Sequence, residues 1–154
     1  MAALSVAVLG AVGIAVATAL PAMAVTINEC EVSHPFCIGA PSLSSGQPVK
    51  ETAAGRNITL ISSGQDFKLR FDADTTKCVL ADISNNVDVI VGSCSASGSV
   101  WSEEFTGTGN NHRWGNIYEI NHGHSEFLTG SGTGINFLLA QQFNGVQVFT
   151  CNCA

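Results

Sequence analysis

The chain has 154 residues, and its 12 acidic and 6 basic side chains give a formal net charge of −6 at neutral pH. This acidic balance disfavours nucleic acid and anionic membrane surfaces as partners, because such complexes need Lys and Arg side chains to neutralise phosphates. After residue 24 the chain is rich in Gly, Ser, Thr and Asn and poor in Leu, a composition that favours short strands and turns over helices.

Residues 1–24, MAALSVAVLGAVGIAVATALPAMA, form an apolar run without a charged side chain. The run ends in Ala22-Met23-Ala24, the small-x-small pattern that signal peptidase cleaves. An uncleaved membrane anchor is the alternative, since about 20 apolar residues can span a bilayer, but a run dominated by Ala, Val and Gly inserts weakly. The sequence therefore predicts a signal peptide over 1–24 and one secreted, extracellular domain over 25–154, free of the membrane after cleavage.

All six cysteines follow the predicted signal peptide, and an even number in a small exported domain indicates a disulfide framework. They are Cys30, Cys37, Cys78, Cys94, Cys151 and Cys153. We expect Cys78 to pair with Cys94 across a small loop. Cys151 and Cys153 would stand about 7 Å apart on a strand, so each is predicted to pair with one N-terminal cysteine. A small Cys30–Cys37 loop, with other pairings elsewhere, is the alternative.

Alternating residues and turn signals predict short strands along the whole domain. In the first part, strands are expected over 25–32, 34–39, 48–52 and 57–62, with a Pro/Ser/Gly loop over 41–48. The central part predicts strands over 67–71, 77–81, 87–91 and 99–105, with turns at 72–76, 84–86 and 92–98. Residues 106–113 are expected to form a polar loop.

The central unit recurs after Trp114 in altered form. The stretch 117–120 corresponds to 69–71, and the later matches set 127–128 against 78–79, 135–139 against 87–91, and 148–149 against 100–101. A poorer third copy sets Cys37-Ile38 against Cys78-Val79, Val49 against Val87, and Leu60 or Ile61 against Val100. Chance similarity between alternating strands is the alternative. Repeats of about 40 residues favour three lobes, approximately 25–65, 66–114 and 115–154, in a closed all-β barrel with neighbouring first and last strands.

The central unit resembles a lobe of the ricin-type β-trefoil lectins. The resemblance lies in Lys77-Cys78-Val79, the strand 87–91, Cys94 and Ser99-Val100-Trp101. Residues 115–149 look like a second lobe, with Glu126-Phe127-Leu128 in place of Lys-Cys-Val. The resemblance implies a β-trefoil-like barrel of three four-stranded lobes, here stapled by disulfides.

Three departures set the chain apart from these lectins. The Gln-x-Trp signature reads Ser99-Val100-Trp101 in one lobe and Gln147-Val148-Phe149 in another. The positions of the family's sugar-binding Asp hold Leu80, Thr129 and Gly39, and those of its stacking aromatic hold Gly92 and Ala140. A galactose pocket needs a carboxylate and a ring, so the resemblance implies the fold without the family's sugar contacts.

The densest set of aromatic and polar side chains flanks the predicted loop 106–113. Exposed aromatic rings beside hydrogen-bonding groups suit a carbohydrate or protein ligand. The alternative is that Trp114 and Tyr118 fill the barrel while the others are solvated. The candidate ligand-binding residues are Trp114, His112, Arg113, Tyr118 and His122.

Other polar motifs are predicted to be structural, with no metal and no cofactor. Asp72-x-Asp74-x-Thr76 lacks the Gly and distal Glu of a calcium loop. His122-x-His124, with Asn121 and Glu126, is a short polar turn with too few ligands for a typical zinc site. Glu103 and Glu104 are adjacent on a strand and so face opposite sides. Asn57-Ile58-Thr59 matches an N-glycosylation acceptor, which matters only in a glycosylating host.

Two functions of different classes remain. The first is a secreted, non-catalytic, monomeric binding module for a glycan or an extracellular protein. The alternative is a small secreted enzyme inhibitor or hydrolase on the same scaffold. An enzyme would require groups such as His112, His122, His124 and Glu119 to converge in a cleft.

Overall fold

The computed structural model describes residues 25–34, 36–107, 109–124, 126–131, 135–140 and 147–151. The predicted signal peptide and Cys153 lie outside these ranges. The described strands are β1 (Val25–Ile27), β2 (Glu29–Glu31), β3 (Cys37–Gly39), β4 (Lys50–Thr52), β5 (Ile58–Ser63), β6 (Asp66–Phe71), β7 (Lys77–Ala81), β8 (Val89–Ser93), β9 (Trp101–Phe105), β10 (Asn111–Asn116), β11 (Phe127–Thr129), β12 (Leu138–Ala140) and β13 (Phe149–Cys151). A 3-10 helix, η1 (Ser97–Ser99), and an α-helix, α1 (Ile117–His122), complete the described elements.

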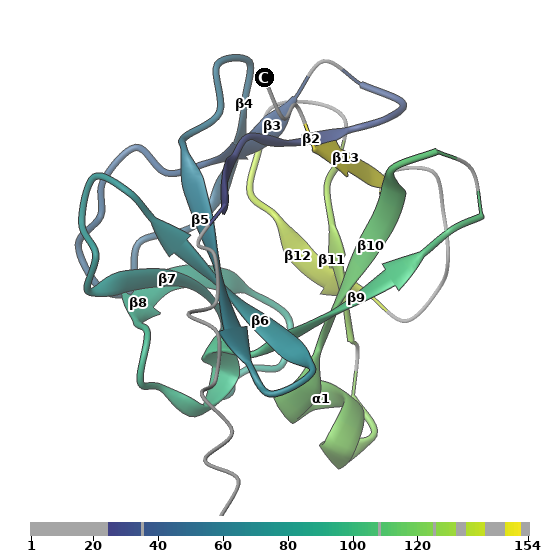
Figure 1. The fold of residues 1–154 in the computed structure, drawn as a ribbon. Coiled ribbons are helices and arrows are strands. Elements are labelled where there is room, and N and C mark those ends of the chain that lie inside the picture. Colours follow the sequence, from purple (N-terminus) through teal and green to yellow (C-terminus); the bar gives the residue numbers. More distant parts are fainter. Residues whose placement is uncertain are drawn as a thin grey trace, which may run out of the picture.

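The strands close into a barrel, as the sequence predicted (Figure 1). Neighbouring strands follow the order β1-β5-β6-β9-β10-β13-β2, and only Asn28 separates β1 from β2 in the chain. The last strand, β13, pairs with β2, so the two ends of the domain are neighbours in the sheet. Closure leaves the barrel wall without a free edge, which suits a chain built from short strands.

Three hairpins, β3–β4, β7–β8 and β11–β12, meet around a pseudo-threefold axis at one end of the barrel. The same backbone hydrogen bond joins each hairpin to the next. Its three copies run from Val91 N to Gln47 O (2.8 Å), from Leu139 N to Val87 O (2.7 Å) and from Glu51 N to Ile135 O (2.8 Å). Each lobe therefore contributes one hairpin and two wall strands, and the expected three-lobed, all-β architecture is confirmed.

The register identifies equivalent inward positions in the three lobes. Ile58 pairs with Phe71, Trp101 pairs with Asn116, and Phe149 pairs with Glu31. All six of these side chains are buried. The copies of one position are therefore Phe71, Asn116 and Glu31, and two residues earlier in each strand they are Leu69, Trp114 and Glu29. The core is apolar in the second lobe and carries buried carboxylates in the first.

The pairing of the weakest copy differs from the prediction by two residues. Ile38 lies opposite Glu51, as Val79 lies opposite Val91 and Leu128 opposite Leu139. Val49 is therefore equivalent to Val89 rather than to Val87. The pattern misled because a glutamate occupies the β4 position that is apolar in the other hairpins.

Residues 117–120 form a helix and not the predicted strand. The side chain of Asn116 accepts hydrogen bonds from the backbone N–H groups of Tyr118 and Glu119, which caps the start of α1. Gly123 ends the helix with a left-handed backbone at φ 72°. An Asn before the first turn and a Gly after the last are standard helix boundaries. The true counterpart of β6 is β10, which begins at Asn111 inside the predicted polar loop.

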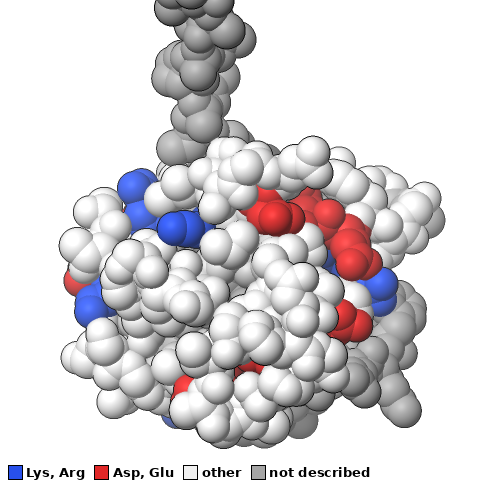
Figure 2. All heavy atoms as spheres, turned by 90° about the horizontal axis from the view of Figure 1, so that it is seen from below, with Lys and Arg blue, Asp and Glu red and all other residues white. Residues whose placement is uncertain are grey.

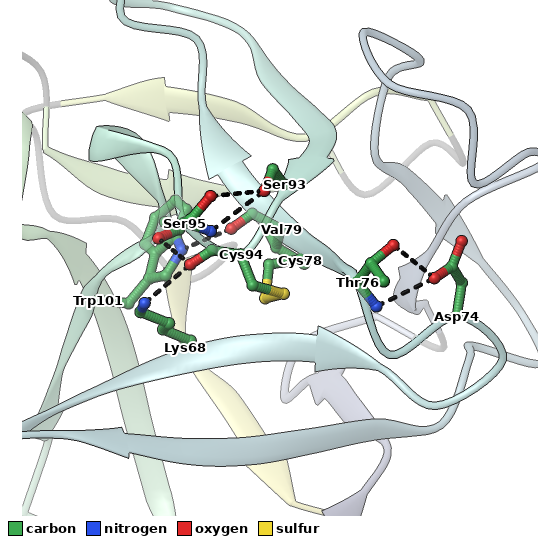
Figure 3. The surroundings of a disulfide bond; sticks show 10 residues. Lys68, Asp74, Thr76, Cys78, Val79, Ser93, Cys94, Ser95 and Trp101 are labelled. Atoms are coloured by element: carbon green, nitrogen blue, oxygen red, sulfur yellow. Dashed lines mark hydrogen bonds between the residues drawn. A yellow bond between two sulfur atoms is a disulfide. The ribbon is translucent and has the colours of Figure 1, made fainter.

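One described disulfide joins the paired strands β2 and β3, and the other joins β7 to the residue that follows β8. Cys78 pairs with Cys94, as predicted, beneath a turn in which Lys68 Nζ donates to the Cys94 carbonyl at 2.8 Å (Figure 3). Cys30 pairs with Cys37, so the prediction that these two bridge to the C-terminal cysteines was wrong. The register explains the difference, because Cys30 lies opposite Cys37 on one side and Thr150 on the other.

The visible face in Figure 2 carries few charged side chains. Most acidic groups gather at the upper right and most basic groups at the left, with some mixing of the two and no continuous basic area. In the described ranges, no helix is long and apolar enough to cross a membrane.

Candidate functional site

The exposed candidates gather on α1. The rings of Tyr118 and His122 stack at 4.1 Å between centroids and 21° between planes. His124 continues the series at 6.1 Å from His122. His122 Nδ1 lies 2.7 Å from the Tyr118 carbonyl, and His124 Nδ1 lies 2.9 Å from Glu119 Oε2. Glu119 is fully buried, so a buried carboxylate holds the ring of His124. We call Tyr118, His122 and His124 the α1 surface.

Trp114 and His112 are not part of that surface. Both occupy inward positions on β10, and their side chains are buried. Trp114 packs edge-on against Phe67 at 6.1 Å and against His112 at 5.1 Å. The expectation that these two residues contact a ligand was therefore wrong. The alternative, in which Trp114 and Tyr118 fill the barrel while the other candidates are solvated, is confirmed for Trp114 alone. Tyr118, which that alternative also placed in the barrel, lies on the partly exposed helix.

His112 belongs to a buried polar cluster inside the barrel wall. Its Nε2 lies 2.9 Å from Glu29 Oε2, and its Nδ1 lies 3.0 Å from the Asn110 carbonyl and 3.5 Å from Glu103 Oε1. Burial alone lowers the pKa of His112, but the hydrogen bond and charge of Glu29 outweigh it and raise that pKa. Burial is also the main reason why the pKa of Glu103 is raised. The neighbouring carboxyl groups therefore favour the positively charged form of His112.

Arg113 points outward from β10, away from His112 and Trp114. Its Nη2 lies 2.6 Å from Glu104 Oε2, and its guanidinium lies 4.0 Å above the ring of Phe127. Glu103 and Glu104 do face opposite sides of β9, since one contacts buried His112 and the other contacts Arg113. Arg113 is thus held by the outer barrel wall.

A second buried polar cluster contains Glu31 and Glu51, which the sequence reasoning missed. A Cβ built on Gly130 would meet carboxylate oxygens of both residues, so the two carboxyl groups converge on one point. Burial, followed by the charge of Glu51 and a hydrogen bond with it, raises the pKa of Glu31 to about 7. His34 Nδ1 lies 3.4 Å from Glu31 Oε2, and Ser131 N and Oγ donate to Glu51. The sequence does contain a hint of this cluster. Glu29 and Glu31 continue the alternation that begins at Ile27, so they occupy the same face of the strand as that apolar residue.

Neighbouring side chains lie close to the backbone at two of the positions that the resemblance compares with sugar-contact positions of the lectins, Gly92 and Gly39. A Cβ added to Gly92 would lie 2.7 Å from Leu80 Cδ2, so the leucine occupies the space beside that glycine. A Cβ on Gly39 would collide with the side chain of Thr52.

The polar turns behave as local structure. Asp74 Oδ1 accepts from the backbone and hydroxyl of Thr76, which lowers the pKa of Asp74 (Figure 3). Among the described residues, no three side chains of His, Cys, Asp or Glu are grouped to hold a metal ion. Of the four groups named for an enzyme, Glu119, His122 and His124 lie together on α1 and just after it, whereas His112 is buried on β10.

No family model and no curated protein matches the chain. A mosquitocidal holotoxin is similar over 86% of this chain at 12% identity and a TM-score of 0.71, and the chain spans 18% of that toxin's length. The designed threefold symmetric protein ThreeFoil is similar over 82% of this chain and 96% of its own, at 13% identity and a TM-score of 0.68. SeviL, solved with asialo-GM1 saccharide, is similar over 85% of this chain and 98% of its own, at 9% identity and a TM-score of 0.66. The chain therefore has the β-trefoil fold, in a form that has diverged far from these proteins in sequence.

Proposed function

We propose that the mature protein is a secreted, non-catalytic binding module that recognises carbohydrate through the α1 surface. The observation that carries the proposal is the Tyr118–His122 ring stack on a short helix. In the second lobe the corresponding connection, between β6 and β7, is only the turn 72–76. The fold therefore needs no helix here, and an aromatic surface on an added element suits a ligand better than it suits the core.

The chemistry of the α1 surface fits a sugar. Stacked rings offer an apolar face to the C–H face of a pyranose, while imidazole nitrogens and the exposed Asn121 can exchange hydrogen bonds with hydroxyl groups. Asn116 fixes the helix from below, because its side chain caps α1 and donates to the Gly98 carbonyl at 2.9 Å. The similarity of SeviL, which was solved with a saccharide, supports the choice of carbohydrate over other ligands.

Secretion and the oligomeric state are the two remaining parts of the proposal. The apolar segment 1–24 and the strand-linking disulfides support secretion. We also propose that the protein is a monomer, which size-exclusion chromatography with light scattering checks directly.

A glycan array on the oxidised mature protein tests the function. We expect saturable binding that Tyr118→Ala and His122→Ala each reduce by about tenfold or more. Phe105→Ala is the matched control, because Phe105 is 70% exposed and lies at the opposite end of the paired strands β9 and β10. An array without signal would refute carbohydrate recognition, and equal losses in all three variants would refute the α1 surface.

A further inference from the structure

A cavity of about 370 Å³ opens between the first and second lobes, away from the α1 surface. Arg56, Asn57, Phe71, Asp72 and Ala73 line it. It lies where β5 begins and β6 ends, one step beyond the last register pair, Ile58 with Phe71. Its volume is in the range of small-molecule sites, about 300–1,000 Å³.

Two residues of opposite charge, Arg56 and Asp72, line this cavity, and each has a neutral hydrogen-bond partner. Arg56 Nε donates to the Ala40 carbonyl at 2.6 Å, and Asp72 Oδ1 accepts from the hydroxyl of Thr59. In the part of the chain that the structure describes, no ion pair joins Arg56 to Asp72. Each charged group is therefore fixed by a neutral partner, and fixed groups lose less freedom when a ligand binds.

The pseudo-threefold symmetry provides an internal comparison. The backbone hydrogen bond from Asp72 N to Asn57 O (3.1 Å) closes this end of the strand pair. Its two copies run from Ile117 N to Val100 O (3.0 Å) and from Val32 N to Val148 O (2.8 Å). The same bond is thus made between apolar residues in both other lobes. The two other lobes therefore close this end of the strand pair without a polar side chain at either position.

We propose that this cavity binds a sugar acid, a monosaccharide-sized molecule with one carboxylate and several hydroxyl groups. The Arg56 guanidinium is suited to the carboxylate, because its planar fork makes paired charge-assisted hydrogen bonds. Asp72 accepts hydrogen bonds from hydroxyl groups, and the exposed amide of Asn57 can donate or accept. The proposal does not rest on the α1 surface, since the two sites share no residue.

Other ligand classes fit this cavity less well. Phe71, the one aromatic residue among its lining, is fully buried, so a neutral sugar that depends on ring stacking lacks a platform. A phosphate or a simple carboxylate would pair with Arg56 but leave Asp72 facing an anion. A sugar acid satisfies both charges at once.

Titration of the mature oxidised protein with D-glucuronic acid, followed by NMR chemical shifts, tests the proposal. The protein is made without N-glycosylation, because a glycan on Asn57 would cover the cavity mouth. We expect saturable shifts at Asn57, Asp72 and Ala73, with affinity about tenfold or more above that for glucose or acetate. Equal affinity for all three probes, or no saturation with glucuronic acid, would overturn the proposal.

Two variants assign the roles. Arg56→Gln is expected to weaken glucuronic acid binding by about tenfold or more, and Asp72→Asn by a smaller factor, because Asn still accepts from Thr59. Lys77→Gln and Asp66→Asn make the same charge changes elsewhere on the surface and should bind like wild type. Unchanged binding in Arg56→Gln, with thermal melts confirming a folded protein, would remove Arg56 from the site and with it the proposal.

Discussion

Replacing Glu31 with Gln should make the protein more stable at slightly alkaline pH while changing little in acid. The carboxyl group of Glu31 is buried beside that of Glu51, and its pKa is raised from 4.5 to about 7. Between these two pH values the folded protein holds a proton that the unfolded chain has released. Glu31 therefore contributes stability that is complete below pH 4.5 and is lost as the pH rises through about 7.

The size of the effect follows from the pKa difference. A shift from 4.5 to about 7 corresponds to about 3.5 kcal/mol as an upper limit, at about 1.4 kcal/mol per pH unit. Partial hydration and relaxation around the carboxyl pair reduce this to about 1.5–3 kcal/mol. For a domain of this size, each kcal/mol changes the melting temperature by about 3–5 °C. Gln is nearly isosteric with a protonated Glu and can still donate to Glu51, so it keeps the packing and removes the titration.

Thermal melts of wild type and Glu31→Gln from pH 4.5 to 8.5 measure this difference. The two melting temperatures should be close at pH 4.5 and separate by about 5–12 °C in favour of the variant above pH 7.5. Asp66→Asn, at the tip of the β5–β6 hairpin, is the control for loss of one negative charge. A constant offset between wild type and Glu31→Gln over the whole pH range would refute the reasoning, because it would mean that Glu31 does not titrate there.

Three further predictions concern the fold. Trp114→Ala should lower the free energy of unfolding by about 3–5 kcal/mol in urea titrations, because a fully buried side chain is removed, whereas Tyr118→Ala should cost below about 1 kcal/mol. Asn116→Ala removes both the cap of α1 and a buried bond to η1; we expect a loss of about 1–3 kcal/mol and weaker helical circular dichroism, and an unchanged spectrum would contradict the capping role. Proteolysis without reduction should release one fragment pair linked through Cys30 and Cys37, and a mass that joins either residue to a C-terminal cysteine would contradict the structure.

The second lobe was predictable because its inward positions follow one rule. Leu69 and Phe71 on β6, and Val79 and Val91 on the hairpin, are apolar and fully buried. Period-two alternation therefore revealed the strands, and the loop between Cys78 and Cys94 was short enough to fix that disulfide. The resemblance to ricin-type lectins rested on the same residues, and the β-trefoil fold that it implied is confirmed.

The first and third lobes were harder because polar residues occupy core positions. His112 was predicted to face a ligand, and no role was predicted for Glu29 and Glu31. All three stand at inward positions of β2 and β10. Pairing inside the barrel makes this possible, since a carboxylate with a histidine or a second carboxyl group can share a proton or a charge. Such pairing depends on register between distant segments, which single-sequence periodicity does not contain. The start of α1 was missed for a simpler reason, because residues 117–120 were matched to a strand and residues 122–124 were interpreted as a turn, while the capping signal at Asn116 was not used.

Comparison of the three lobes separates residues that serve the fold from residues that need another explanation. Where a position is apolar in two lobes and charged in the third, the fold does not require the charge. By this criterion Glu31 and Glu51 replace apolar or amide groups of the other lobes, and the raised pKa of Glu31 predicts a pH-dependent stability. Asp72 replaces Ile117 and Val32 at a surface cavity, where a charge can contact a ligand instead of a neighbouring strand. A similar comparison applies to the connection that contains α1. It is longer than the turn between β6 and β7 in the second lobe, so the fold does not require the helix. Charged residues that replace apolar ones inside the barrel are expected to affect the stability of the fold. Charged residues that replace apolar ones at the surface can contact a ligand without loss of the fold.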